Sequence, residues 1–597
     1  MRHLVKTYQL FLDYLKKRLS RLQFMMYAAV ITGLIAGLAA VLLKTLVHFV
    51  GEWIKRPGKP DLVYLLFPTL GLILTVFITR RFFNGLLQKG IGMVLRAIAG
   101  KAAYIPLADT YKHIVTSSMT VGLGGSVGLE SPIVATGAAI GSNTARLNGM
   151  EYRERTLLIA CGAAAGISAV FNAPIAGVIF AIEVLLTETV VSYFIPLMIA
   201  SVTGALCSKI ILQEETLFNF RLQQAFDYHN VPFYILLGFA AGFISLYYSR
   251  TFKKVERRIH DLQVKPYTRA VMAGALLVVL LFVFPPLYGE GYDTIRLLAN
   301  ANQQLITDKF LGRHLLNGWG LIAFAGAIIL MKPVAAGITL GAGGNGGNFA
   351  PSLFVGAYLG FFISRLANAS KWLQLPEGNF SLVGMAGVLS GVMYCPLTAI
   401  FLIAEITNGY ELFIPLMIVS AISYFIVRNF EPYSMETRQL ALEGQIYTHR
   451  KEDNILFGLR PLDFLTEEYQ TIDQDKRLND LVELIKKSKH NIYPVVDTDH
   501  RFVGIVELND VKKQLFDTAA FWKTTVRSIM KPAPEIILAD EPMKKVMEKM
   551  DLTQSWYLPV LDADRRFLGF ISKSRIFEKY RASLASQTDL YQSDSSN

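Results

Sequence analysis

The chain has 597 residues, of which 52% are hydrophobic and 18% are charged, and its formal net charge is +12. A soluble chain of this length would be divided into several domains richer in charge. The basic residues lie mostly beside apolar runs, which is typical of the cytoplasmic edges of membrane proteins and disfavours a nucleic-acid partner. Composition therefore predicts a membrane part up to about residue 440 and a soluble part after it.

The N-terminal segment, residues 1–23, is strongly basic and contains a single acid, Asp13. By the positive-inside rule we expect it to lie in the cytoplasm. The apolar run that follows is too long for a cleavable signal, and no small-residue cleavage site interrupts it.

Several uncharged stretches are long enough to span a bilayer, which needs roughly 20 apolar residues. They are Met25–Leu43, Leu62–Thr79, Thr189–Ser208, Val231–Ser249, Ala270–Gly289, Leu315–Met331 and Leu412–Val427. Two other apolar stretches contain glycine-rich runs, at Val121–Gly128 and Gly341–Gly347. Because lipid cannot satisfy irregular backbone, these runs are expected to be buried in protein or to line a wet cavity.

The membrane part repeats itself. The run Gly128–Pro132, followed by Gly137 and Gly141, recurs 219 residues later as Gly347–Pro351, followed by Gly356 and Gly360. A second block, Ser168–Pro174 and then Glu183, recurs 222 residues later as Ser390–Pro396 and then Glu405. Matching broken segments in two halves predict a transport site at mid-membrane.

Each glycine–proline run predicts a helix that begins inside the protein, because proline suits the first helical turn and glycine allows close approach. Two such N-termini, with unpaired amides, form a site for an anion without any full positive charge. Glu130 stands in the first run, and an acid within the membrane indicates a functional group. Its carboxylate would compete with the anion for the amides and would leave on protonation.

The soluble part also repeats, at an offset of 65 residues. Tyr493–Asp497 with Phe502–Val506 recurs as Leu558–Asp562 with Phe567–Ile571. Each copy predicts two short strands around an Asp-containing turn, preceded by an amphipathic helix and followed by another.

Together these motifs resemble the CLC chloride channel and transporter family, with a C-terminal pair of CBS modules. The family's Gly-x-Glu-x-Pro and Gly-x-Phe-x-Pro motifs are matched by Gly128–Pro132 and Gly347–Pro351. The resemblance implies an all-α polytopic fold of two inverted-repeat halves with broken helices, plus a cytoplasmic α/β CBS-pair domain. It implies a homodimer with an anion pore in each subunit. The expected boundaries are 1–23, a cytoplasmic segment; 24–440, the anion-pathway domain; 441–462, a linker; 463–522 and 523–582, the CBS modules; and 583–597, a disordered tail.

The resemblance assigns Glu130 as the gate. The other positions it places along the anion pathway are Lys89, Gly90, Ile91, Gly128, Leu129, Ser131, Gly347, Asn348, Phe349, Ala350 and Glu436.

Three positions depart from the family pattern. Lys89 replaces an anion-coordinating serine, and Glu436 replaces an anion-coordinating tyrosine, so we expect the two to form an ion pair in or beside the pathway, unless both reach cytoplasmic water instead. Val184 replaces the internal proton-transfer glutamate of the exchangers, although neighbouring Glu183 could still carry protons. Glu183 and its repeat mate Glu405 could equally share a structural role at helix ends.

The sequence thus predicts a gated channel for chloride or a similar anion in the plasma or inner membrane. A proton-coupled anion exchanger and a non-conducting regulatory membrane protein are the alternatives. No nucleophile–base constellation or metal cluster appears in the sequence, which disfavours an enzyme, and no cofactor is expected in the membrane part. In the CBS pair, Asp510 follows the second strand of the first copy, where an acid holds the ribose of an adenine nucleotide in related modules. A dimerising scaffold without ligand is the other reading.

Overall fold

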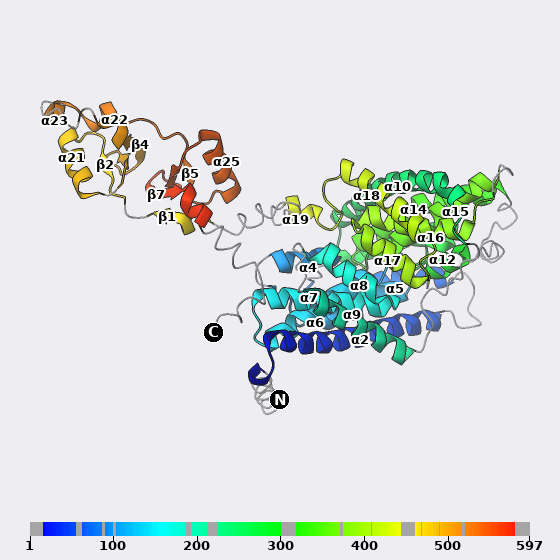
Figure 1. The fold of residues 1–597 in the computed structure, drawn as a ribbon. Coiled ribbons are helices and arrows are strands. Elements are labelled where there is room, and N and C mark those ends of the chain that lie inside the picture. Colours follow the sequence, from blue (N-terminus) through cyan, green and yellow to red (C-terminus); the bar gives the residue numbers. More distant parts are fainter. Residues whose placement is uncertain are drawn as a thin grey trace. The chain divides into compact units, whose positions relative to one another are not determined.

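In the computed structural model the chain divides into two compact units, Met1–Glu443 and Gly444–Asn597, drawn in Figure 1. The structure describes residues 16–54, 63–85, 90–99, 103–186, 193–212, 225–299, 318–369, 374–407, 409–442, 460–466, 469–488, 490–512, 514 and 520–578. Lys89, most of the expected linker and the expected C-terminal tail lie outside these residues.

The helices of the first unit are joined by short loops, and its described residues contain no strand longer than an isolated bridge. Its helices are α2 (Arg21–Ile54), α3 (Phe67–Phe82), α4 (Gly90–Ala99), α5 (Asp109–Gly122), α6 (Glu130–Leu147), α7 (Tyr152–Phe171), α8 (Pro174–Phe180), α9 (Phe194–Leu212), α10 (Val231–His260), α11 (Pro266–Val283), α12 (Tyr292–Ala299), α14 (Trp319–Gly341), α15 (Phe349–Asn368), α16 (Glu377–Met393), α17 (Pro396–Ile406), α18 (Phe413–Phe430) and α19 (Arg438–Leu442). Short helical turns lie at η1 (Val63–Leu66), η2 (Ala181–Leu185), η4 (Tyr228–Asn230) and η5 (Pro285–Leu287).

Within the described residues, nine helices are long and apolar enough to cross a membrane. Each of the seven predicted spans overlaps one of them. Two further helices, α7 and α15, were not predicted as spans, because they are rich in small residues and lie almost wholly inside the protein. The predicted span to Gly289 was too long, since α11 ends at Val283 before two prolines that cannot continue it.

The repeated motifs produce repeated packing. Helix α6 lies on α7, and α15 lies on α16 in the same way, as the cyan and yellow-green groups of Figure 1 show. A Cβ atom on Gly141 would overlap the carbonyl of Leu158, and one on Gly360 would overlap the carbonyl of Phe380. The repeated glycines therefore let paired helices touch backbone to backbone, as small residues do in membrane bundles.

The second repeated block ends each of these helix pairs with the same turn. Asn172 after α7 and Tyr394 after α16 both have left-handed backbone, with φ of 54° and 59°. Pro174 and Pro396 then start α8 and α17 in their first turn. This sharp reversal separates α7 from α8 and α16 from α17, and so breaks each apolar stretch into two helices.

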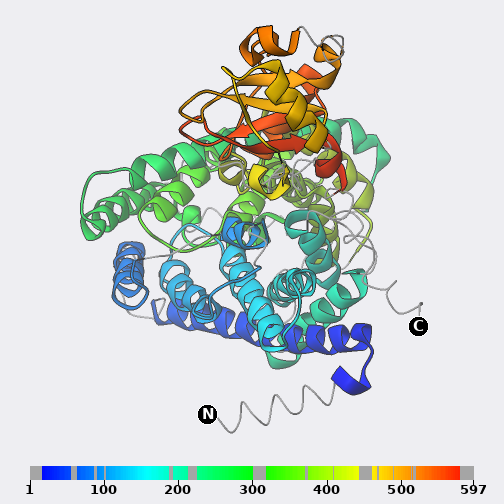
Figure 2. The ribbon, with the colours of Figure 1, turned by 90° about the vertical axis from the view of Figure 1, so that its left-hand side faces the viewer.

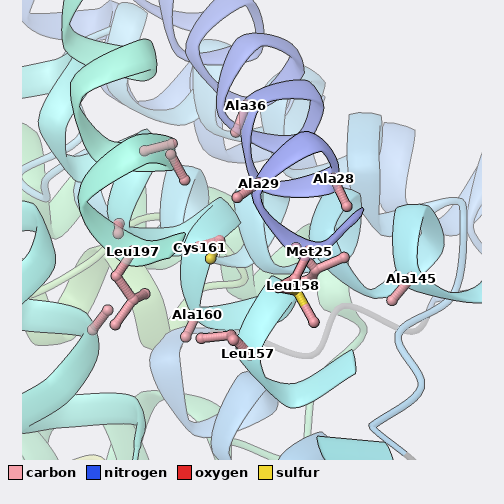
Figure 3. Packing of buried hydrophobic residues seen from close by; sticks show 14 of the residues in the cluster. Met25, Ala28, Ala29, Ala36, Ala145, Leu157, Leu158, Ala160, Cys161 and Leu197 are labelled. Atoms are coloured by element: carbon pink, nitrogen blue, oxygen red, sulfur yellow. The ribbon is translucent and has the colours of Figure 1, made fainter. Parts of the chain in front are cut away.

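Helix α2 packs along α5, α6, α7 and α9 and runs along their edge in Figure 2. Small side chains make this contact close: Ala28, Ala29 and Ala36 lie in one buried cluster with Cys161 and Leu197, shown in Figure 3. The core of this half is thus built on small apolar residues, for which dispersion at close range is the main attraction in a bilayer.

The second unit contains two strand–turn–strand modules. Its elements are η7 (Pro461–Phe464), β1 (Leu465–Thr466), β2 (Ile472–Asp473), α21 (Leu478–Lys487), β3 (Ile492–Val496), β4 (Phe502–Glu507), α22 (Leu508–Val511), α23 (Ala520–Lys523), α24 (Val526–Ile529), β5 (Ile537–Leu538), α25 (Met543–Thr553), β6 (Tyr557–Leu561) and β7 (Phe567–Ser572). The strands form one sheet in the order β2-β3-β4 and another in the order β1-β7-β6-β5. Both predicted hairpins are present, antiparallel in each case.

The predicted aspartates make the two hairpin turns alike. Asp497 Oδ1 accepts the amide of Arg501 at 2.8 Å, and Asp562 Oδ1 accepts that of Arg566 at 2.7 Å. The two turns also pair with each other through an Arg501–Arg566 bridge. Aspartate suits these turns because its side chain bonds backbone amides a few residues on.

Candidate functional site

The N-termini of α6 and α15 are joined directly. Gly128 and Gly347, each two residues before the first residue of its helix, exchange two backbone hydrogen bonds of 2.9 Å each. A Cβ atom on Gly347 would stand 2.5 Å from the Cβ of Ser131, and one on Gly128 would overlap the carboxylate of Glu130. Glycine is therefore required at both positions, and the two halves of the chain meet at the start of these two helices.

Glu130, the first residue of α6, is 1% exposed. Its Oε2 accepts the amide of Ala350, in the first turn of α15, at 3.4 Å, and its Oε1 accepts the hydroxyl of Tyr292. Phe349, the residue before Ala350, packs its ring on that of Phe171, with ring centroids 5.6 Å apart. The carboxylate thus occupies an amide that the α15 N-terminus would otherwise offer to an anion.

A third helix N-terminus, that of α4, lies close by. Gly90 starts α4 in left-handed backbone with φ of 70°. A Cβ atom there would be 3.1 Å from Glu436 Oε2 and 3.9 Å from Ser131 Oγ. The amide of Gly92 donates to the Glu436 carboxylate, and neighbouring Ile91 is buried. The structure therefore brings Glu436 to the start of α4, whereas its expected partner Lys89 lies outside the described residues.

Tyr248 of α10 was not singled out from the sequence, although it is fully buried at this site. Its hydroxyl donates to Asn348 Oδ1 at 3.1 Å. Asn348 immediately precedes α15, so Tyr248 adds a hydroxyl beside the amides of that helix. Nothing local in the sequence marks Tyr248, because its position depends on how α10 packs against α15.

Glu290, Tyr292 and Lys332 also reach this site, and none of the three was predicted from the sequence. The amide of Leu129 donates to Glu290 Oε1 at 3.2 Å. Lys332, fully buried in α14, donates to Ser126 Oγ and to the Gly289 carbonyl, each at 2.9 Å. Lys332 is the single charge between two apolar stretches, a signal that could have identified it, since charges within membrane segments are costly.

Glu183 and Glu405 cap helices of the opposite half. The Glu183 carboxylate accepts the amides of Leu397 and Thr398, at 3.1 and 2.8 Å, and the Thr398 hydroxyl at 2.8 Å, at the start of α17. The Glu405 carboxylate accepts the amides of Ile175 and Ala176, at 2.9 and 2.8 Å, at the start of α8. Each acid thus satisfies amides that its partner helix leaves unpaired.

Val184 follows Glu183 in η2 and is half-buried. Its apolar side chain offers no group that binds a proton. Glu183 therefore caps the start of α17, and a proton path through these two residues would have to use the same Glu183 carboxylate.

In the CBS unit, Asp510 of α22 is bound to a lysine. Lys531 Nζ lies 2.8 Å from Asp510 Oδ2 and 3.1 Å from Glu507 Oε2. The hydrogen bond that Lys531 donates to Asp510, together with Glu507, raises the pKa of Lys531. In the second copy Arg575 donates to the Leu465 carbonyl at 3.0 Å. A ligand hydroxyl that binds the Asp510 carboxylate would therefore either displace the Lys531 ammonium or share the carboxylate with it.

The chain is similar to known chloride channel proteins over most of its length. A family model described as "Voltage gated chloride channel" matches residues 71–428, and the CBS domain model matches residues 462–517 and 526–582. "Chloride channel protein CLC-e" of Arabidopsis thaliana is 26% identical over 81% of this chain and 75% of its own length. The crystal structure of a slow cyanobacterial Cl⁻/H⁺ antiporter has a TM-score of 0.60 at 21% identity, over 72% of this chain and 99% of that one. That of a eukaryotic CLC transporter has a TM-score of 0.56 at 15% identity, over 92% and 97%.

Proposed function

The chain belongs to the voltage-gated chloride channel (CLC) family, which transports anions, and we propose that it is a gated channel for chloride or a similar anion. The observation that carries the proposal is the junction of the α6 and α15 N-termini through Gly128 and Gly347, closed by the Glu130 carboxylate. Backbone amides at helix N-termini attract an anion without holding it as tightly as a full charge would.

Glu130 acts as the gate in this proposal. Ionised, it accepts the Ala350 amide and excludes the anion from that position. When Glu130 is protonated it is neutral, so its hydrogen bond to the amide is weaker and a permeant anion competes for that amide successfully. Chloride conductance therefore rises as pH falls on the side from which Glu130 is reached.

A proton-coupled exchanger is the second candidate function, favoured by the fold shared with the cyanobacterial antiporter. Against it stand the apolar Val184 and the capping bonds that occupy Glu183. A third candidate, a non-conducting regulatory protein, draws support from the Glu436 carboxylate at the α4 N-terminus, where it would repel an entering anion.

One experiment separates these three functions. Purified protein is reconstituted in liposomes, and chloride and proton movements are recorded together with two electrodes. Chloride efflux alone supports the channel, coupled chloride and proton fluxes support the exchanger, and neither flux supports the regulatory protein.

For the rest of the molecule we propose a homodimer in the plasma or inner membrane, with the N-terminus and the CBS pair in the cytoplasm. We also propose that the CBS pair binds an adenine nucleotide, with Asp510 at the ribose. The proposal is supported by the position of Asp510 directly after β4, half-exposed beside Lys531.

A further inference from the structure

The connection between α11 and α12 brings an acid, Glu290, to the N-terminus of α6. Glu290 lies between Gly289 and Gly291, whose φ angles of 63° and 90° are left-handed. A side chain on Gly291 would also overlap the Phe354 ring. This backbone directs the Glu290 carboxylate to Leu129, whose amide donates to it at 3.2 Å.

Two carboxylates therefore share the amides where α6 and α15 begin. Glu290 accepts the amide of Leu129, and Glu130, the next residue, accepts that of Ala350. Tyr292, two residues after Glu290, donates its hydroxyl to Glu130. Like charges in one buried site disfavour each other's ionised form, and their protons are released in coupled steps.

Lys332 holds this connection in place. Its ammonium group donates to the carbonyl of Gly289 and to Ser126 Oγ, each at 2.9 Å, and lies 4.7 Å from the centre of the Phe354 ring. Lys332 thereby ties the backbone beside Glu290 to the segment that leads into α6. A lysine with no exposed surface is tolerable only with such partners.

Several titratable groups act on Glu290. The described residues bring Glu130 from α6, Lys332 from α14, Lys44 from α2 and Tyr292 from α12 within electrostatic reach of it. Burial disfavours an ionised Glu290 most strongly and the Glu130 carboxylate adds to this, whereas the two lysines favour it. Glu290 is thus placed to respond to pH together with Glu130.

We propose that Glu290 is a second carboxylate of the gate, which holds the Leu129 amide and sets the pH at which Glu130 leaves the anion path. This inference rests on the proposed gating role of Glu130. It adds a positioning residue, because Glu290 acts on the anion through its effect on Glu130.

The test is chloride efflux from liposomes containing the full chain, measured at a series of pH values equal on both sides. Removing the negative charge in Glu290→Gln makes Glu130 easier to ionise, so the midpoint of activation moves to lower pH, by about one unit. Lys332→Met removes a positive charge and makes Glu130 harder to ionise, so the midpoint of activation moves to higher pH. Glu130→Gln combined with Glu290→Gln shows no pH dependence.

Asp293→Asn is the matched control, since Asp293 is an exposed acid three residues after Glu290 in the chain, and its midpoint stays at the wild-type value. An unshifted midpoint in Glu290→Gln, with wild-type efflux at the lowest pH, overturns the role of Glu290. If Glu290→Gln does not fold, Glu290→Asp is measured instead: its shorter side chain leaves the Leu129 amide and lowers the midpoint, and an unmoved midpoint overturns the proposal. If wild-type efflux does not depend on pH, the proposed gating role of Glu130 itself is wrong. This outcome differs from a failure of the Glu290 proposal alone, in which wild-type efflux still depends on pH.

Discussion

The exchanged caps of Glu183 and Glu405 allow a prediction with an internal control. Each carboxylate accepts two amides at the start of a helix in the opposite half, and Glu183 accepts the Thr398 hydroxyl as well. Substitution by glutamine removes the charge and leaves one oxygen for two amide donors. If Glu183 serves as a cap, Glu183→Gln and Glu405→Gln should destabilise the membrane unit in the same manner.

The magnitudes follow from the bonds. A hydrogen bond to a charged group contributes roughly 1.5–3 kcal/mol. In Glu405→Gln one such bond is lost and the other loses its charge, so the expected cost is about 2 kcal/mol. In Glu183→Gln the Thr398 hydroxyl bond also loses its charged acceptor, and the cost should exceed that of Glu405→Gln by about 1 kcal/mol.

Thermal unfolding of the purified protein in one detergent measures the difference. Glu183→Gln should melt at a lower temperature than Glu405→Gln, and both below wild type. Thr398→Ala makes the Glu183 cap match the Glu405 cap, which has Ala176 at the equivalent position. In the Thr398→Ala background, Glu183→Gln and Glu405→Gln should therefore have the same melting temperature.

An unchanged melting temperature in Glu183→Gln would refute the capping account. Proton flux, recorded in liposomes, gives a second criterion. If Glu183→Gln abolished proton flux and spared chloride flux, while Glu405→Gln did neither, Glu183 would belong to a proton path and the exchanger would be the better description.

Three further predictions follow from the sites. Glu130→Gln should conduct at all pH values in liposome efflux, whereas wild-type efflux should rise as external pH falls; a variant with the wild-type pH profile would contradict the gate. If Glu436 opposes Lys89, Glu436→Gln should tighten chloride binding and slow flux, and Lys89→Met should weaken binding. Strictly additive effects on chloride affinity in the double mutant, measured by titration, would exclude an ion pair. Calorimetric titration of residues 459–583 with ATP, ADP and AMP should give binding that Asp510→Ala weakens about tenfold, the loss of one hydrogen bond to a charged group; no heat with any of the three would favour a scaffold without ligand.

Much of the fold could be predicted from the sequence, because its signals are local. Charge-free stretches identify spanning helices since every residue facing lipid must be apolar, and the predicted spans fall on the observed helices. The repeated glycines and prolines identified the broken helices, because those residues set backbone conformation wherever they occur. The strand pairs of the soluble part followed from alternation around Asp497 and Asp562, which bond their own turns.

The tertiary structure alone decided which groups meet. Helix α7 was not predicted, and for α15 only its start at Gly347–Pro351 was predicted; both helices are covered by protein rather than by lipid. The meeting of Glu130 with Glu290, and of Glu183 with Thr398, joins positions 160 and 215 residues apart in the chain. Hydropathy and motif spacing act over a few turns, whereas these contacts arise from packing one repeated half against the other. The sequence itself determined that an acid would stand at the start of a helix inside the membrane part, and the packing determined that it stands there with a second acid and a buried lysine.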